Sequence, residues 1–413
     1  MADPVVAIVG AGQAGFQTAA SLQQEGFRGS VVLIGDEPVI PYQRPPLSKS
    51  YLAGQSGVDE LWLRPAEFYA KQQIDLVYGD PVTAIDREKR SLQLGSGRKF
   101  SWDHLVFATG ARYRPLPVPG ADLDGVLPLR TLADADMLQQ RLAIANDIVV
   151  VGAGFIGLEF AAVAIARGAR VHILEITHHP MGRVVSVPTS RFFADAHAQW
   201  GAQVSLGVGV TRILGNGSGR VGEVETTAGR RIAADLVLIC IGVIPNSELA
   251  GQAGLAVDNG IVVDEYLATS DPAISAIGDC ANFPTPFAAS RVRLESVQNA
   301  VDQARCVAAR IAGKLEPYQK VPWFWSDQGD LKLQIAGITA GHDQSVVRGD
   351  PAARSFSVFC FRGDRLIGIE SVNRTADHVA ARRILAGEPG LSPEQAADKD
   401  YDLRAHARRL PVR

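Results

Sequence analysis

One sequence pattern occurs twice in this chain and limits the folds open to it. In its first copy, residues 5–9 form a short β-branched run, and the loop Gly10-Ala-Gly12-Gln-Ala-Gly15 follows directly. Residues 14–24 then have helical spacing, and residues 31–34 form a second apolar run. This order of strand, glycine loop, helix and strand predicts a βαβ unit of about 30 residues with its parallel strands covered on both faces.

The first glycine loop has the spacing of a dinucleotide-binding site. The glycines allow a tight turn, close approach of a diphosphate and close packing of helix on sheet, while the helix N-terminus faces the phosphates. Asp36, with Glu37 beside it, follows the second apolar run, where a carboxylate accepts hydrogen bonds from ribose hydroxyls. The loop therefore predicts a bound dinucleotide.

The second copy runs from an apolar strand at 148–151 through Gly152-Ala-Gly154-Phe-Ile-Gly157 to a helix at 158–166 and a strand at 171–174. Glu175 ends that strand, and a carboxylate there binds both ribose hydroxyls of NADH and repels the 2′-phosphate of NADPH. No arginine lies between 176 and 182, and the nearby His178 and His179 are read as solvated loop residues. We expect NADH here. Because hydride exchange between two bound dinucleotides requires that one be a flavin, the pair is expected to be FAD and NADH.

Composition excludes several other classes of protein. The net charge of −3 and pI near 6.3 provide no basic field for nucleic acid or an anionic membrane. Cys240, Cys280, Cys306 and Cys360 are too widely spaced for a disulfide framework, a metal site or an iron–sulfur cluster, and indicate a reduced, cytoplasmic protein. The N-terminus lacks the pattern of a secretory signal. The apolar stretch 148–166 approaches the length of a membrane span, but its glycines favour a buried strand, turn and helix.

Three further apolar strands and a change in the hydrophobic pattern indicate how the chain divides into domains. Apolar runs at 105–110, 236–242 and 274–278 each end in a glycine, as expected where strand ends approach a ligand. From about Pro322 the pattern changes to alternating segments such as 332–338 and 356–361, ending in a polar tail. We expect an α/β chain with two Rossmann-like domains and a C-terminal α+β domain. The FAD domain is assigned to 1–112 and 247–321, the NADH domain to 113–246 and the last domain to 322–413.

Seven segments together resemble the NADH-dependent [2Fe-2S] ferredoxin reductases of the putidaredoxin reductase type, relatives of rubredoxin reductase and apoptosis-inducing factor. The segments are residues 41–49, 105–110, 129–132, 152–159, 241–246, 277–280 and 322–328. The resemblance covers nearly the whole chain and implies a glutathione-reductase-like architecture. It assigns the following residues to cofactor binding: Gly10, Gly12, Ala14, Gly15, Asp36, Arg44, Lys49, Val82, Thr109, Gly110, Arg130, Gly152, Gly154, Gly157, Glu159, Glu175, Arg183, Gly242, Asp279, Val297 and Trp325.

The resemblance also implies catalytic roles for Lys49, Glu159 and Trp325. Lys49 is expected close to the reactive flavin nitrogen, where a cation stabilises the charge that arrives with hydride. Glu159 lies in an apolar helix, where a charge is costly unless it is paired, and is expected near the nicotinamide and able to pair with Lys49. Trp323 and Trp325 are expected on one face of a strand, against the flavin and near the partner's docking surface. A carboxylate favoured by the helix dipole and a core aromatic pair are the ordinary alternatives.

The sequence departs from the family at one place. Relatives often carry Ala-Pro-Arg between the acidic residue and the Met-x-Arg segment, whereas this chain has Glu175-Ile-Thr-His-His-Pro-Met-Gly-Arg183. Contacts to the adenosine end of NADH are therefore less firmly assigned than the hydride chemistry.

The expected activity is hydride transfer from NADH to FAD, followed by single-electron transfer to an acidic [2Fe-2S] ferredoxin that supplies a haem-thiolate monooxygenase or ring dioxygenase. The iron–sulfur cluster is expected in the partner, and no metal in this chain. Docking candidates are Arg64, Arg291, Arg293, Arg382 and Arg383. A monomer or weak dimer is expected. Rubredoxin reductase and a redox-sensing flavoprotein remain alternatives, while a disulfide reductase is disfavoured because no cysteine precedes position 240.

Overall fold

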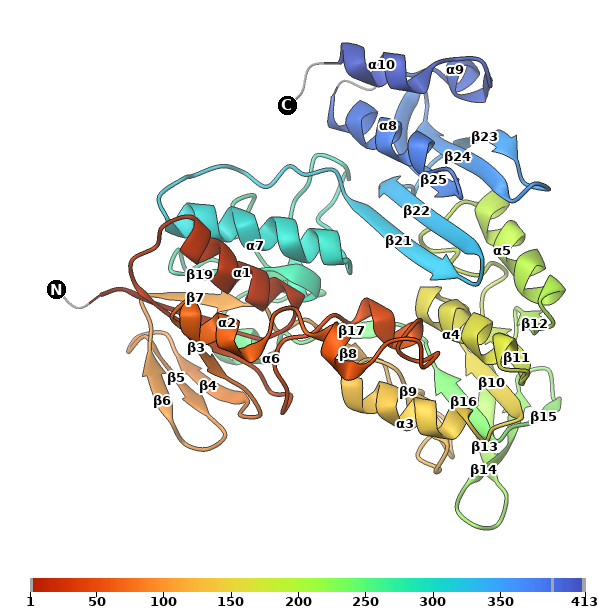
Figure 1. The fold of residues 1–413 in the computed structure, drawn as a ribbon, viewed down its shortest axis with the longest axis horizontal. Helices are drawn as coiled ribbons and strands as arrows, with labels where there is room; N and C mark the ends of the chain where they lie inside the picture. The colour runs from red at the N-terminus through yellow and green to blue at the C-terminus, as the bar shows by residue number, and fades with distance from the viewer. Residues whose placement is uncertain (1–2, 388–389, 411–413) are drawn as a thin grey trace. The chain divides into compact units, whose positions relative to one another are not determined.

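The computed structural model describes residues 3–387 and 390–410, and its chain divides into two compact units (Figure 1). Unit 1 comprises residues 1–43, 58–112 and 244–320, and unit 2 comprises residues 44–57, 113–243 and 321–413. The short segment 44–57 belongs to unit 2 although its flanking segments belong to unit 1. Strands β8 (Ala111–Tyr113) and β17 (Val243–Pro245) lie where the chain passes between the units.

Unit 1 is built on a parallel five-stranded sheet in the order β19-β7-β1-β2-β3. Its strands are β1 (Val5–Val9), β2 (Ser30–Ile34), β3 (Ile74–Val77), β7 (His104–Phe107) and β19 (Ile274–Ala276). Central side chains such as Ile8, Leu33 and Phe107 are fully buried, which explains why these strands read as continuous apolar runs.

Helices and smaller strands surround this sheet. Figure 1 shows α1 (Gln13–Gln24) and α7 (Val297–Ile311) packed side by side. The other elements of unit 1 are α2 (Ala66–Lys71), α6 (Glu248–Gln252), the antiparallel β4 (Val82–Asp86), β5 (Ser91–Leu94) and β6 (Lys99–Ser101), the pair β18 (Ile261–Val262) and β20 (Ala281–Asn282), and the 3₁₀ turns η2 (Val58–Leu61) and η3 (Gly278–Cys280).

Unit 2 is built on a second parallel five-stranded sheet, ordered β12-β11-β10-β16-β9. Its strands are β9 (Val126–Pro128), β10 (Asp147–Val151), β11 (Arg170–Glu175), β12 (Gln203–Leu206) and β16 (Leu236–Ile239). The accompanying elements are the 3₁₀ turn η1 (Pro45–Ser48), α3 (Leu132–Leu142), α4 (Phe155–Ala166), α5 (Val187–Gln199), and the antiparallel β13 (Val210–Gly215), β14 (Val221–Thr226) and β15 (Arg231–Ala233). The strand order reverses between β1 and β7 in the first sheet and between β10 and β16 in the second, and such a point is where open α/β sheets bind ligands.

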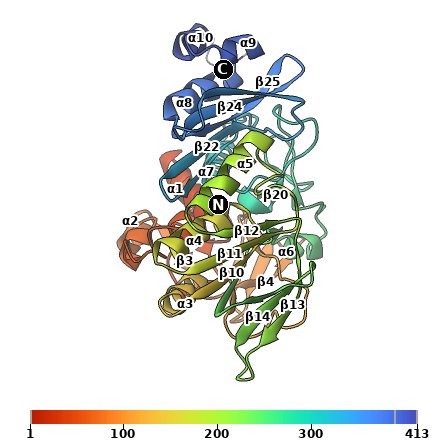
Figure 2. The same ribbon diagram turned by 90° about the vertical axis from the view of Figure 1, so that its right-hand side faces the viewer.

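The C-terminal part of unit 2 is an antiparallel sheet in the order β21-β22-β25-β24-β23. Its strands are β21 (Trp323–Gln328), β22 (Leu331–Gly337), β23 (Gln344–Asp350), β24 (Ser355–Arg362) and β25 (Arg365–Val372). Figure 2 shows α8 (Thr375–Ala386) against this sheet, with α9 (Pro393–Ala397) and α10 (Leu403–Arg409) beyond it. The parallel and antiparallel sheets confirm the predicted α/β class with a C-terminal α+β part.

Two sequence expectations need correction. The helix expected from residue 158 begins at Phe155, because Gly154 in extended conformation already forms its N-cap. The expected polar tail contains α9 and α10, whose Ala396, Leu403 and Ala407 are buried in the C-terminal core. These helices are short and carry few apolar residues, so their periodicity is weak in the sequence.

Among the residues that the structure describes, no helix combines the length and apolar character needed to cross a membrane. The apolar stretch that raised this question is divided between strand β10, the second glycine loop and the 12-residue helix α4.

Candidate functional site

The first glycine loop lies between β1 and α1, and its three glycines have different physical roles. Gly10 has a φ of 110°, and a Cβ there would lie 2.2 Å from the Ala108 carbonyl oxygen. A Cβ at Gly15 would lie 1.9 Å from the Gly10 carbonyl oxygen. A Cβ at Gly12 would meet nothing within 4 Å. The first and third glycines are thus required by packing, whereas the second leaves open space beside the helix.

The N-terminus of α1 faces this space without a partner of its own. Gly12 is the N-cap and, having no side chain, leaves the first backbone N–H groups of the helix without a side-chain cap. Open space and free N–H groups at the end of a 12-residue helix fit a diphosphate.

Several other predicted residues of unit 1 lie near the same edge of the sheet. Thr109 and Gly110 directly follow β7 and are fixed by Asn246: the Thr109 hydroxyl donates to the Asn246 carbonyl at 2.5 Å, and the Asn246 amide returns a 2.9 Å bond to the Thr109 carbonyl. Asp279 follows Gly278, whose backbone N–H donates to Gln303 at 2.7 Å. A Cβ at Gly278 would lie 3.2 Å from that of Ala14, so the Asp279 turn and the glycine loop are brought together.

For the other predicted residues of unit 1, the structure shows the position in the fold but no contact that would identify a cofactor site. Asp36 is exposed just after β2, in position for a ribose, while its neighbour Glu37 accepts a 2.6 Å hydrogen bond from Tyr42. Val82 opens β4 and is packed in the hydrophobic core, and Val297 is the first residue of α7. Cofactor contacts of Val82 and Val297 stay predictions.

The glycines of the second loop, between β10 and α4, have steric surroundings similar to those of the first loop. Gly152 has a φ of 102°, and a Cβ there would lie 2.4 Å from the Cys240 carbonyl oxygen. A Cβ at Gly157 would lie 2.3 Å from the Gly152 carbonyl oxygen, while one at Gly154 would have its nearest neighbour at 3.9 Å. Gly154 caps α4 without a side chain. Unit 2 therefore has its own open cradle at a helix N-terminus.

Glu175 is held beside this cradle by three donors. Its Oε2 accepts from the Ala153 backbone N–H at 2.8 Å, and its Oε1 accepts from the backbone N–H and the hydroxyl of Thr177, both at 2.9 Å. A carboxylate has about four lone-pair sites, so it can still accept ribose hydroxyls. Thr177 was not identified from the sequence, because its contact with Glu175 depends on the turn that folds it back onto that residue.

Arg183 and Gly242 meet on the same side of unit 2. A Cβ at Gly242 would lie 3.5 Å from the Arg183 guanidinium, and Arg183 itself is exposed. His178 is exposed, as expected for a solvated loop histidine, and His179 is half-buried.

Lys49 and Glu159 form a buried ion pair in unit 2, with Lys49 Nζ 2.7 Å from Glu159 Oε2 and exposed side-chain fractions of 20% and 4%. Two hydroxyls complete the site. Ser48 donates to Oε2 at 2.5 Å, and Ser326 donates to Oε1 at 2.7 Å. The pairing suggested by the resemblance is therefore present. The two serines were not identified from the sequence, although both lie inside the segments that carried the resemblance.

Aromatic rings line the segment that supplies Ser326. The Trp323 and Trp325 ring centroids are 5.6 Å apart, which confirms that both indoles share one face of β21. On the other face, Phe324 contacts Phe155 of the second glycine loop at 4.6 Å. Elsewhere in unit 2, Arg44 donates to the Arg130 carbonyl at 2.7 Å, which joins two further predicted residues.

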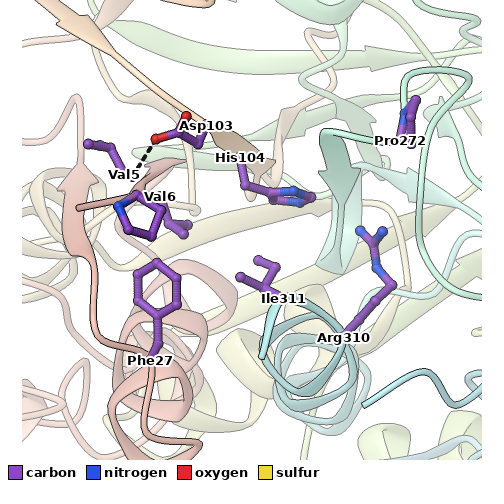
Figure 3. A pocket seen from close by; sticks show the side chains of 9 residues that line it. Val5, Val6, Phe27, Asp103, His104, Pro272, Arg310 and Ile311 are labelled. Carbon is purple, nitrogen blue, oxygen red and sulfur yellow. Dashed lines mark hydrogen bonds between the residues drawn. The ribbon is translucent and has the colours of Figure 1, made fainter. Parts of the chain in front are cut away.

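A different hollow lies at the opposite edge of the unit 1 sheet (Figure 3). Its volume is about 400 Å³, and it is bounded by Val5, Phe27, Asp103, His104, Arg310 and Ile311. Ser275 contacts two polar groups of this hollow. Its hydroxyl oxygen accepts a hydrogen bond from the Arg310 guanidinium and lies 2.9 Å from His104 Nε2. Burial, and then the Arg310 charge, lower the pKa of His104 to about 3, so this ring is neutral. No glycine loop borders the hollow.

All four cysteines are free thiols. Within residues 3–387 and 390–410, no group of three or more His, Cys, Asp and Glu side chains is arranged to hold a metal ion.

Comparison with known proteins agrees with this geometry. Residues 4–304 match the family model described as pyridine nucleotide-disulphide oxidoreductase, and residues 323–407 match the reductase C-terminal model. Rhodocoxin reductase of Rhodococcus erythropolis is 52% identical over 399 residues, covering 97% of this chain and 93% of that protein.

Two solved structures are also similar over the full length. The ferredoxin reductase for the CYP199A2 system of Rhodopseudomonas palustris has a TM-score of 0.96 and 51% identity, covering 98% of this chain and 100% of that one. The covalent putidaredoxin reductase–putidaredoxin complex has a TM-score of 0.95 and 41% identity, with 99% and 100% coverage. The chain, with its two glycine cradles and its C-terminal reductase sheet, belongs to the pyridine nucleotide-disulphide oxidoreductase family of FAD-dependent enzymes.

Proposed function

We propose that this protein is an NADH:ferredoxin oxidoreductase that binds FAD on unit 1 and NADH on unit 2, and passes electrons singly to a [2Fe-2S] ferredoxin serving an oxygenase. The observation that carries the proposal is the pair of open glycine cradles, each at the uncapped N-terminus of a 12-residue helix. The ferredoxin partner is supported by the names of the similar proteins, which are ferredoxin or redoxin reductases.

We propose an FAD domain of residues 1–112 and 247–321, an NADH domain of residues 113–246 and a C-terminal domain of residues 322–413. The three large sheets support this division, although residues 44–57 of the proposed FAD domain belong to unit 2. The cytoplasm is the proposed compartment, where free thiols are the rule.

FAD, when bound, supplies a ring that takes up a hydride and releases electrons one at a time. The residues of this protein bind the two cofactors and position them. Gly12 and Gly154 leave room for the diphosphates, and Asp36 and Glu175 accept ribose hydroxyls. Lys49, which the resemblance assigns to the flavin, provides the cation that would stabilise developing negative charge, and Glu159 holds its ammonium group in place.

NADH is the proposed donor in preference to NADPH. Glu175 is fixed by three hydrogen bonds, so it would have to stay beside a 2′-phosphate and repel it. No lysine or arginine lies between it and Arg183.

The candidates for ferredoxin docking differ in their surroundings. Arg291 binds the backbone carbonyls of Val263 and Asn282, and the 10%-exposed Arg293 pairs with Glu295 at 2.7 Å. Both guanidinium groups have partners within unit 1, and their part in docking stays a prediction. Arg64 and Arg383 are exposed, and Arg382 lies over the Trp323 ring at 4.6 Å.

Anaerobic titration of the purified yellow protein tests the proposal. NADH is expected to bleach the flavin at a lower concentration than NADPH, and a [2Fe-2S] ferredoxin is expected to reoxidise it. The rate of ferredoxin reduction should fall on the order of tenfold as salt screens the docking charges. A protein that keeps its colour with both nucleotides would contradict the first step, while reduction of rubredoxin but of no [2Fe-2S] ferredoxin would contradict the second.

A further inference from the structure

The hydrogen bonds at Glu159 continue into the protein beyond Ser326. Gln328 donates from Nε2 to the Ser326 hydroxyl oxygen at 3.2 Å, and His197 Nε2 lies 3.0 Å from Gln328 Oε1. Ser326, Gln328 and His197 each have an exposed fraction of 0%. A buried row of polar groups therefore joins α4, β21 and α5 within unit 2, and we call it the Glu159 chain.

Gln328 fixes the direction of the bonds in this chain. Its Nε2 also lies 3.7 Å from the sulfur of Met181, which can accept a hydrogen bond but cannot donate one. The amide nitrogen therefore faces Met181 and Ser326, and the carbonyl oxygen faces His197. Because that oxygen is an acceptor, His197 must donate from Nε2.

The other ring nitrogen of His197 determines its charge. Nδ1 is buried and has no hydrogen-bond partner, so a second proton would be placed where nothing accepts it. Burial accordingly lowers the pKa of His197. The ring is neutral and carries its single proton on Nε2. At the other end, Ser326 already accepts from Gln328, so its own hydrogen is free for Glu159 Oε1.

We propose that Ser326, Gln328 and His197 are positioning residues, which hold the Glu159 carboxylate in one orientation beside Lys49 through hydrogen bonds that all point toward it. This inference rests on the proposed function, in which Glu159 holds Lys49. Bonds in such a row polarise one another, so each donor strengthens the next hydrogen bond toward the carboxylate. The Glu159 chain also links β21, the strand that carries Trp325, to the Glu159 carboxylate on α4 through hydrogen bonds.

The titratable groups around the chain are few. Lys49 faces Glu159 from the segment after η1, and Cys240 lies behind Gly157. Burial, and then the Glu159 charge, raise the pKa of Cys240 to about 12, so this thiol stays protonated near neutral pH. The ring of Trp200, 4.9 Å from His197, contributes no charge.

The first experiment compares the rate of flavin reduction at increasing NADH concentration in Ser326→Ala, Ser326→Thr and wild-type holoenzyme, measured by stopped flow. Loss of this donor leaves Glu159 Oε1 without its hydroxyl partner, so the limiting rate in Ser326→Ala should fall about tenfold, while the NADH concentration that gives half of that rate should stay within about twofold of the wild-type value. Threonine keeps the hydroxyl and should restore the limiting rate. Glu159→Gln should lower the limiting rate at least as far as Ser326→Ala.

Ser357→Ala is the matched control. Ser357 is equally buried, lies on β24 of the same sheet and donates to the Asp377 carboxylate at 3.1 Å, outside the Glu159 chain. Its limiting rate of flavin reduction should equal that of the wild type. Equal limiting rates in Ser326→Ala and the wild type, or an equal loss of rate in Ser357→Ala, would overturn the proposal.

A second measurement does not depend on turnover. Nitrogen-15 NMR of the holoenzyme labelled in histidine, with His197 assigned through His197→Gln, reports which ring nitrogen carries the proton. A neutral ring protonated on Nε2, and a changed signal in Gln328→Leu, are expected. A His197 ring protonated on Nδ1 would contradict the direction of the hydrogen bonds proposed for the Glu159 chain. A protein that NADH does not reduce would refute the proposed function while leaving this measurement interpretable.

Discussion

The different surroundings of Gly10 and Gly12 allow FAD binding to be separated from folding. Gly12 has φ −81° and ψ −163°, an extended conformation that alanine adopts readily, and a Cβ there meets no protein atom within 4 Å. Gly12→Ala should therefore change the free energy of unfolding of the apoprotein by no more than about 0.5 kcal/mol. The new methyl group occupies the space proposed for the diphosphate, and we expect FAD to bind about 100-fold more weakly, a loss of about 2.7 kcal/mol.

Linkage converts this loss into a stability measurement. At an FAD concentration 100 times the wild-type Kd, bound FAD stabilises the wild type by about 2.7 kcal/mol. At the same concentration Gly12→Ala would be half-saturated and gain only about 0.4 kcal/mol. Urea unfolding of the apoproteins with and without FAD measures both values, and quenching of flavin fluorescence gives the Kd directly.

Two further variants control the experiment. Gly10→Ala places a Cβ 2.2 Å from the Ala108 carbonyl oxygen at a φ of 110°, and should destabilise the apoprotein itself by about 3 kcal/mol or more. Gly154→Ala makes the equivalent change in unit 2, and should weaken NADH binding while FAD content stays at the wild-type level. Wild-type FAD affinity in Gly12→Ala, or loss of flavin from Gly154→Ala instead, would refute the assignment of the two cradles.

Three other predictions follow from single groups. Glu175→Ala should raise the KM for NADH on the order of tenfold, because ribose acceptors are lost, and leave FAD content unchanged; steady-state kinetics with an absorbance spectrum checks both, and loss of flavin would mean that the two nucleotide loops are assigned the wrong way round. Burial, and then the Arg382 charge, lower the pKa of His378 to about 4 from an ordinary value of 6.5. Because the unfolded chain binds this proton more readily, His378 contributes up to about 3 kcal/mol of stability above pH 6.5, which is lost as pH falls toward 4. Urea unfolding of His378→Phe should therefore depend less on pH between 4 and 6.5, and an unchanged slope would contradict this. Burial also raises the pKa of Cys240 to about 12 and that of Cys306 to about 11, so neither thiol of the native protein should react with a thiol reagent at pH 8 at the rate seen in urea.

Much of the fold is local enough to be predicted from the chain alone. A run such as Val5–Val9 followed by glycines and a helix specifies its own βαβ unit, because strand, turn and helix are adjacent in sequence. The same holds for the cradles, since a glycine required by packing and an uncapped helix start are properties of a few consecutive residues. The two C-terminal helices were not predicted from the sequence, because α9 and α10 are short and depend on the core that they help to cover.

The surroundings of Glu159 were decided by tertiary structure. The sequence indicated that a carboxylate in an apolar helix needs partners, and a family resemblance suggested Lys49, but residue spacing carries no information that Ser48 and Ser326 donate to the same group. These residues are separated from Glu159 by more than a hundred positions. Likewise, only the packing of α5 against β21 brings His197 to Gln328 and leaves its Nδ1 without an acceptor. Local patterns thus predicted the two glycine cradles, because their shape depends on backbone geometry within a few consecutive residues. The hydrogen-bond partners of Glu159 come from distant segments, which only the folded chain brings within hydrogen-bonding distance.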